Sequence, residues 1–153
     1  GIEPINLHFH AFNNNELALK YDRINKIRSV LDSYTKSKFY LMPSYLFQAE
    51  ATKAGRYENI MFKRFMLKVA EKIAKKENAK AIRPLIGFGK DEIIELAKKI
   101  NTYEYSLLPY PDVCSIFSRH PKTKSDIKTV KNLEKNMHMN EIVKRSMKLY
   151  NIV

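Results

Sequence analysis

The sequence predicts an α/β fold with a doubly wound, mainly parallel sheet. Short segments of alternating apolar and polar residues are separated by longer segments in which apolar residues recur at helical spacing. This order is typical of βαβ units, whose strands lie parallel in one sheet. The chain has 153 residues and shows no internal repeat, which fits a single domain.

The first elements follow from local patterns. Residues 5–12 alternate apolar and polar side chains, which predicts a strand. Three consecutive asparagines end this strand and supply an N-cap for a helix that runs to about residue 34. Residues 38–42 predict a second strand, which Pro43 ends.

A long helix is expected over residues 57–76, followed by a third strand near residues 81–82. The side chains expected to form the buried stripe of that helix are Ile60, Met61, Leu67, Ala70, Ile73 and Ala74. The segment from residue 122 to residue 136 is lysine-rich, and either a loop or a solvated helix fits it.

A further helix is expected over residues 90–100, with Gly89 as its N-cap. The side chains expected to form its core face are Ile93, Ile94, Leu96, Ala97 and Ile100. A last amphipathic helix is expected over residues 140–150, so that the segment 137–153 packs on the domain.

The charge balance favours a polyanionic partner. Lys and Arg number 28 against 16 Asp and Glu, a net charge of +12 with a pI near 9.7. Such an excess attracts nucleic acid. A surface rich in lysine and glutamate, as in thermophiles, would explain many lysines but not the excess of one sign.

Membrane insertion, secretion and structural zinc are not indicated. No apolar run is long enough to span a bilayer, and the first residues lack the regions of a signal peptide. The chain has one cysteine and no cluster of Cys and His, so we expect no metal site. A lone cysteine fits a reducing compartment, and we therefore expect a cytoplasmic protein.

Cys114 is the first candidate for chemistry. Pro109 and Pro111 restrict the backbone before it, and a basic run at residues 119–124 follows. Nearby cations favour the nucleophilic thiolate, although a lone cysteine is more often a small buried apolar residue. Asp112 is a second catalytic candidate, and a turn-forming role explains it equally well.

Several blocks together resemble a known family over almost the whole chain. The most specific is Pro109-Tyr110-Pro111-Asp112-Val113-Cys114-Ser115-Ile116-Phe117. The others are residues 5–9, 61–74, 83–87, 90–94, 102–104 and 120–124. Their order and spacing resemble the C-terminal nucleotide-binding domain of the tRNA 4-thiouridine synthetases, which also carry sulfur for thiamine thiazole synthesis. The resemblance implies a fold of the adenine-nucleotide α-hydrolase type with a pyrophosphate loop (PP-loop).

The resemblance also implies a reaction and its partners. Family members use ATP, and we expect Mg²⁺ with it, to adenylate a tRNA uridine, after which a sulfur-bearing cysteine displaces the adenylate. Cys114 matches the cysteine that takes part in sulfur transfer. A cysteine desulfurase or another sulfur donor, tRNA and a second copy of the chain in a homodimer are the implied partners.

The resemblance assigns further residues to ligands. His8, Phe9, Lys63 and Arg64 are expected at the nucleotide, and tRNA contacts are expected from Arg83, Arg119, Lys122 and Lys124. Simpler explanations stand beside these. Lys63 and Arg64 fit a solvated helix face, Arg83 fits a charge at a strand end, and the lysines after residue 120 fit general solubility.

The sequence also departs from the family. The phosphate-binding Ser-Gly-Gly-x-Asp-Ser loop with its strand, and a glycine-rich segment near residues 80–81, have no counterpart in it. Our hypothesis is that the printed sequence is not one continuous gene product. The leading interpretation is an ATP-dependent tRNA sulfurtransferase that makes 4-thiouridine. The alternative is a truncated, non-catalytic tRNA-binding relative, and another tRNA thiolase is a weaker third.

Overall fold

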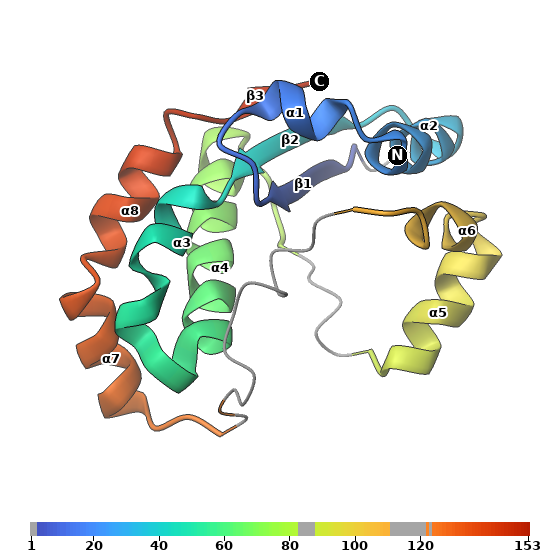
Figure 1. Ribbon diagram of the computed structural model, residues 1–153. Coiled ribbons are helices and arrows are strands. Elements are labelled where there is room, and N and C mark those ends of the chain that lie inside the picture. Colours follow the sequence, from blue (N-terminus) through green and yellow to red (C-terminus); the bar gives the residue numbers. More distant parts are fainter. Residues whose placement is uncertain (1–2, 83–87, 111–121, 123) are drawn as a thin grey trace.

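The computed structural model describes residues 3–82, 88–110, 122 and 124–153 of the chain (Figure 1). In this part the sheet has three strands in the order β1-β2-β3, which are β1 (Ile5–His10), β2 (Lys38–Pro43) and β3 (Asn151–Ile152). β1 and β2 are parallel with Ile5 opposite Lys38, whereas β2 and β3 are antiparallel. The predicted α/β class is confirmed, with a sheet that is small and mixed in the described residues.

Helices lie on both sides of this sheet. Their bounds are α1 (Asn15–Leu19), α2 (Asp22–Tyr34), α3 (Tyr45–Ala51), the 3₁₀ helix η1 (Thr52–Tyr57), α4 (Glu58–Lys76), α5 (Lys90–Lys99), α6 (Tyr103–Ser106), α7 (Ile127–Asn136) and α8 (Met139–Ser146). In Figure 1, α1 and α2 lie to one side of the strands, and α3, α4, α7 and α8 gather on the other. None of the helices described is long and apolar enough to cross a membrane.

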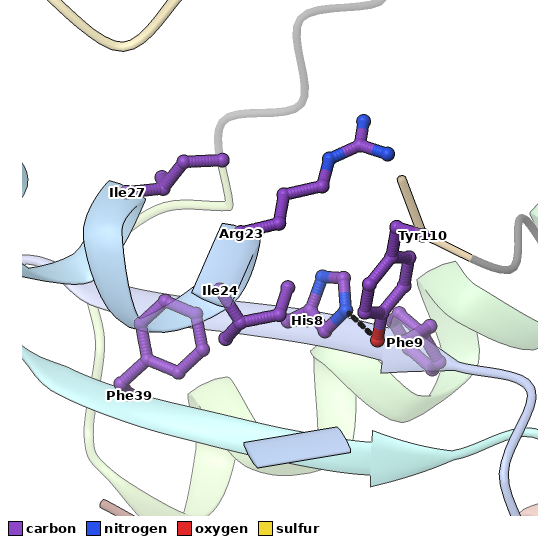
Figure 2. Close-up of a pocket in the computed structure, with 7 residues that line it drawn as sticks. All are labelled: His8, Phe9, Arg23, Ile24, Ile27, Phe39 and Tyr110. Carbon is purple, nitrogen blue, oxygen red and sulfur yellow. Dashed lines mark hydrogen bonds between the residues drawn. The ribbon is translucent and has the colours of Figure 1, made fainter. Parts of the chain in front are cut away.

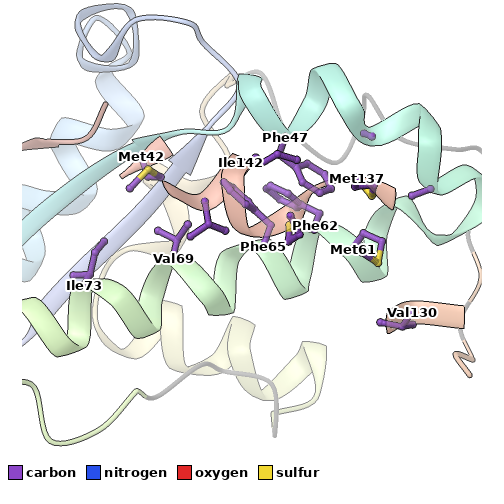
Figure 3. Packing of buried hydrophobic residues seen from close by; sticks show 14 of the residues in the cluster. Met42, Phe47, Met61, Phe62, Phe65, Val69, Ile73, Val130, Met137 and Ile142 are labelled. Carbon is purple, nitrogen blue, oxygen red and sulfur yellow. The ribbon is translucent and has the colours of Figure 1, made fainter. Parts of the chain in front are cut away.

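The larger core lies between the sheet and α4 (Figure 3). Tyr40 and Met42 of β2 are fully buried in it, and Phe47 of α3 stacks on Phe65 of α4 with ring centroids 5.2 Å apart. Burying an aliphatic or aromatic side chain contributes about 1.5–3 kcal/mol. Side chains alternate along β2, so Phe39 and Leu41 point to the opposite face, where they pack with Ile24 of α2 in a smaller cluster.

The buried face of α4 differs from the expected stripe. Met61 and Ile73 are buried as predicted, but Leu67 is 45% exposed. The other buried residues of the helix are Phe62, Phe65 and Val69. Phe9 contacts Phe62 and Phe65 edge-on, and Phe47 stacks on Phe65. Because these aromatic contacts decide which side of α4 faces the core, the phenylalanines are buried in place of the predicted stripe of smaller side chains.

The expected helix over residues 90–100 is confirmed as α5. The Gly89 amide donates a hydrogen bond of 2.6 Å to the Glu92 carboxylate, which closes the first turn. Its expected core face is only half-buried: Ile93, Ile94, Ala97 and Ile100 are partly covered, Leu96 is 37% exposed, and no residue of α5 is fully buried. The helix contacts α6 and stands apart from the larger core in Figure 1.

Three more expectations about elements were wrong. The helix after the asparagines is divided into α1 and α2, with a break at Lys20–Tyr21. Residues 81–82 form no strand. The last helix ends at Ser146, and the chain then turns back to form β3, where the Val153 amide donates to the Phe39 carbonyl at 3.0 Å. α7 shows that part of the lysine-rich segment is helical, with Val130 in the core.

Candidate functional site

A small pocket opens between β1 and α2 (Figure 2). Its volume is about 220 Å³. The lining residues come from β1, α2, β2 and the segment after α6, and they are His8, Phe9, Arg23, Ile24, Ile27, Phe39 and Tyr110. The pocket therefore joins the first strand to the segment that leads into the Pro-Tyr-Pro-Asp-Val-Cys block.

Tyr110 is held against β1 by a direct contact with His8. The His8 Nε2 atom and the Tyr110 hydroxyl are 2.9 Å apart, and the two rings meet edge-on with centroids 5.5 Å apart. Phe12 and Tyr21 also meet the Tyr110 ring edge-on, at 6.0 and 5.3 Å. Edge-on aromatic pairs of this kind add to the energy of burial. This cluster fixes the segment that lies four residues before Cys114 in sequence.

Among the residues that line the pocket, His8 is neutral and Arg23 carries a positive charge. Burial, and then the charges of His10 and Arg23, lower the pKa of His8 to about 4. His8 is thus uncharged at neutral pH and offers one donor and one acceptor. The Arg23 guanidinium lies 5.5 Å from the Tyr110 ring centroid, a cation–π distance.

The end of β1 is tied to the C-terminal part of the chain. His10 is fully buried, and its Nε2 atom lies 2.8 Å from the Asn15 Oδ1 atom. Asn15 donates through Nδ2 to the Leu149 carbonyl at 2.7 Å. Burial lowers the pKa of His10, although the Asn15 hydrogen bond opposes this. These bonds position the strand that carries His8.

A larger groove of about 720 Å³ runs between β1 and α4. Its lining is mainly apolar and consists of Ile5, Asn6, Leu7, Phe9, Lys63, Met66, Leu67, Ala70, Ile73, Ala74, Ala79, Ala81 and Ile82. Phe9 lines both the pocket and the groove, whereas His8 lines only the pocket and Lys63 only the groove. Phe9 therefore shares one cavity with His8 and the other with Lys63, whereas His8 and Lys63 line different cavities.

The remaining predicted residues lie elsewhere or outside the described part. Arg64 donates from Nε to the Glu134 carboxylate of α7 at 2.8 Å, and this bond raises the pKa of Arg64. Lys122 and Lys124 are exposed. Cys114, Asp112, Arg83 and Arg119 lie outside the described residues, so their roles stay predictions.

The pocket contains residues that the sequence did not single out. Arg23 and Tyr110 are the two polar ones, and Tyr110 could have been found because it lies within the most specific block. Arg23 gave no signal, since it is one of many cations on a helix. Over residues 3–82, 88–110, 122 and 124–153, no group of three His, Cys, Asp or Glu side chains is arranged to hold a metal ion.

The strand order and the helices on both sides of the sheet define an α/β domain. The family model described as "Thiamine biosynthesis protein (ThiI)" matches residues 1–82 and 78–139. The chain therefore belongs to the ThiI family.

Curated relatives carry the name "Probable tRNA sulfurtransferase". The protein of Clostridium botulinum (strain Alaska E43 / Type E3) is 29% identical over 187 positions, which cover 100% of this chain and 48% of the relative. That of Acetivibrio thermocellus is 27% identical over 180 positions, covering 96% and 46%. That of Thermoanaerobacter sp. (strain X514) is 34% identical over 118 positions, covering 58% and 31%. The chain spans about half the length of the first two relatives.

A solved structure shares the fold. The crystal structure of a 4-thiouridine synthetase–RNA complex with bound ATP matches 99% of this chain and 48% of its own, with a TM-score of 0.78 and 24% identity. The match shows that the helices and strands of this chain are arranged in space as they are in that structure.

Proposed function

We propose that this chain is the sulfur-transferring half of an ATP-dependent tRNA sulfurtransferase that makes 4-thiouridine. The observation that carries the proposal is the hydrogen bond between His8 and Tyr110, because it holds the segment before Cys114 beside a pocket on β1. Membership of the ThiI family and the names of the relatives support the same activity. The PP-loop type of fold is part of this proposal.

The pocket suits a planar base rather than a whole nucleotide. Its volume of about 220 Å³ is below the roughly 300–1,000 Å³ that is typical of ligand sites. Phe9 and Phe39 offer apolar walls, and the neutral His8 can hydrogen-bond a base edge. We assign the adenine of ATP to this pocket, with the phosphates outside it, where Mg²⁺ would accompany them.

The proposed reaction begins with adenylation of the tRNA uridine. The uridine O4 atom attacks the α-phosphorus of ATP, and pyrophosphate leaves. The outer sulfur of a persulfide on Cys114 then attacks C4, a C–S bond forms, and AMP leaves with the C4–O bond electrons. A cellular dithiol cleaves the remaining S–S bond and is oxidised to a disulfide, which frees 4-thiouridine and the Cys114 thiol. A cysteine desulfurase or another donor restores the persulfide.

Two further parts of the proposal concern context. The reaction is placed in the cytoplasm, since thiols are kept reduced there. The same persulfide would also serve thiamine thiazole synthesis, and the family description "Thiamine biosynthesis protein (ThiI)" supports a role in thiamine biosynthesis. A homodimer would bring two such domains to one tRNA.

A non-catalytic tRNA-binding protein is the second candidate. The net charge of +12 and the exposed Lys122 and Lys124 favour it, because they serve binding without chemistry. Such a protein would bind tRNA with an affinity that falls as salt rises, and would release no pyrophosphate from ATP.

The test uses the full-length protein with ATP, Mg²⁺, a persulfide donor, a dithiol and unmodified tRNA. We expect 4-thiouridine from the wild type, and none from Cys114→Ser, which should still release pyrophosphate. Leu107→Ala is the matched control, because Leu107 is 61% exposed and lines neither cavity. Binding of tRNA without any product from the wild type would favour the second candidate. Full product from Cys114→Ser would exclude the persulfide role.

A further inference from the structure

The two nitrogens of the His8 imidazole have different surroundings. Nε2 lies 2.9 Å from the Tyr110 hydroxyl, whereas Nδ1 has no hydrogen-bond partner among the described residues. Figure 2 shows this second nitrogen on the edge of the ring turned away from the Tyr110 hydroxyl. It is also accessible, unlike Nδ1 of His10, which is fully buried without a partner. A base that enters the pocket therefore meets Nδ1 as the polar atom of His8.

The contact with Tyr110 decides which nitrogen of His8 carries the proton. His8 is uncharged at neutral pH and has one ring N–H, so Nδ1 is a donor when Nε2 accepts, and an acceptor when Nε2 donates. A phenol O–H is a stronger donor than an imidazole N–H, and an imidazole nitrogen is a stronger acceptor than a phenol oxygen. The contact is therefore best satisfied when Tyr110 donates to Nε2. This arrangement leaves the proton on Nδ1.

Arg23 strengthens the Tyr110 hydroxyl as a donor. The guanidinium lies 5.5 Å from the Tyr110 ring centroid, and a positive charge there stabilises the negative charge that develops on the phenol oxygen. Arg23 itself has donors only. Besides Tyr110, the polar side chains that line the pocket are His8 and Arg23, and the remaining lining side chains are apolar. The pocket therefore suits a ligand edge that accepts hydrogen bonds.

We propose that Tyr110 determines which edge of the base the pocket recognises, by fixing His8 in the form that carries its proton on Nδ1. His8 then donates from Nδ1 to a ring nitrogen of the base, and it cannot accept from an exocyclic amino group. Tyr110 acts through His8 and is thus a positioning residue for base recognition. The inference rests on the proposed function for the identity of the base, which is adenine.

The position of the proton is measured first, without any nucleotide. The full-length protein with isotope-labelled histidine nitrogens is studied by NMR at neutral pH, where the chemical shift of a ring nitrogen distinguishes N–H from a bare nitrogen. The His8→Gln variant assigns the signals of His8. We expect the proton on Nδ1 in the wild type, and a loss of this preference in Tyr110→Phe, because Nε2 then has no donor. Addition of ATP should shift the Nδ1 signal.

Nucleotide analogues then test the recognised edge. Dissociation constants are measured by calorimetry for ATP, for analogues in which one ring nitrogen at a time is replaced by CH, and for an analogue without the amino group. One of the ring-nitrogen analogues should bind about two- to tenfold more weakly than ATP, which is the worth of one neutral hydrogen bond. Tyr110→Phe should reduce this penalty and leave the effect of removing the amino group unchanged.

Tyr103→Phe is the matched control. Tyr103 also has a cation over its ring, with Lys98 Nζ 5.3 Å from the ring centroid, and it lines neither cavity. The variant loses a tyrosine hydroxyl as Tyr110→Phe does. It should keep the proton of His8 on Nδ1 and the wild-type penalty for the ring-nitrogen analogue.

Three results would overturn the inference. One is a proton on Nε2 of His8 in the nucleotide-free wild type. Another is a wild type that tolerates the replacement of each ring nitrogen. The third is an equal change of the penalty in Tyr110→Phe and Tyr103→Phe.

The measurements also separate this inference from the proposed function. None of them uses tRNA or sulfur, so their failure is distinct from a failure to form 4-thiouridine. ATP that binds without changing the His8 signals would show that adenine lies elsewhere. That result would overturn the adenine assignment together with the base recognition inferred from it.

Discussion

Replacing His8 with Gln should make the free energy of unfolding less sensitive to acid. His8 has a pKa of about 4 in the folded chain, against 6.5 for an ordinary histidine, mainly because it is buried. Between these values the unfolded state binds more protons, so stability is lost as the pH falls from about 6.5 to about 4. At pH 5 the loss from this one group is at most about 2 kcal/mol, and at pH 7.5 it is close to zero.

The assay is urea unfolding at pH 7.5 and pH 5, followed by far-UV circular dichroism. Gln places an amide near the position of His8 Nε2, so it can keep a hydrogen bond to Tyr110, but it does not titrate. The difference between wild type and variant isolates His8, because the buried His10 contributes with the same sign to both.

Tyr110→Phe is the matched control. It removes the hydrogen bond at 2.9 Å but leaves the burial of His8 largely intact, so the loss of stability at pH 5 should remain. The reasoning is refuted if His8→Gln loses as much stability between pH 7.5 and pH 5 as the wild type does.

Two other predictions concern the core and the link to the C-terminal strand. Phe65→Ala should destabilise the chain by about 3–5 kcal/mol in urea unfolding, because Phe65 is fully buried and stacked on Phe47; a cost below about 1 kcal/mol would contradict this packing. Asn15→Ala should cost about 1–3 kcal/mol, because the His10 imidazole and the Leu149 carbonyl lose their partner. Amide exchange in residues 151–153 should then quicken, and unchanged exchange would show that the bond does not hold β3.

The sequence predicted elements whose signals are local, and failed where a distant partner decides. α5 was located from Gly89 and the acidic residues that follow it, because a helix start depends on a few neighbouring residues. β3 was missed, since two exposed residues become a strand only by pairing with Tyr40 and Leu41. The buried face of α4 was misjudged, because the choice between Leu67 and Phe65 depends on what faces the helix.

The same limit applies to the site. The block around Tyr110 marked one part of it, and the His-Phe end of β1 marked another. Their contact joins residues 102 apart, and local periodicity contains no information about such a pair. Arg23 enters the pocket only through the position of α2 beside β1.

The ion pair between Arg64 and Glu134 has a consequence for any polyanion that approaches α4. A phosphate can use the Arg64 guanidinium fully only by displacing the Glu134 carboxylate, which also lies 3.8 Å from Lys68. The energy of that pair is then subtracted from the binding energy, and α7, which carries Glu134, loses a contact with α4. If a polyanion displaced Glu134 from Arg64, the position of α7 would therefore change on binding. A polyanion that binds too weakly to break this ion pair would not use Arg64 in this way.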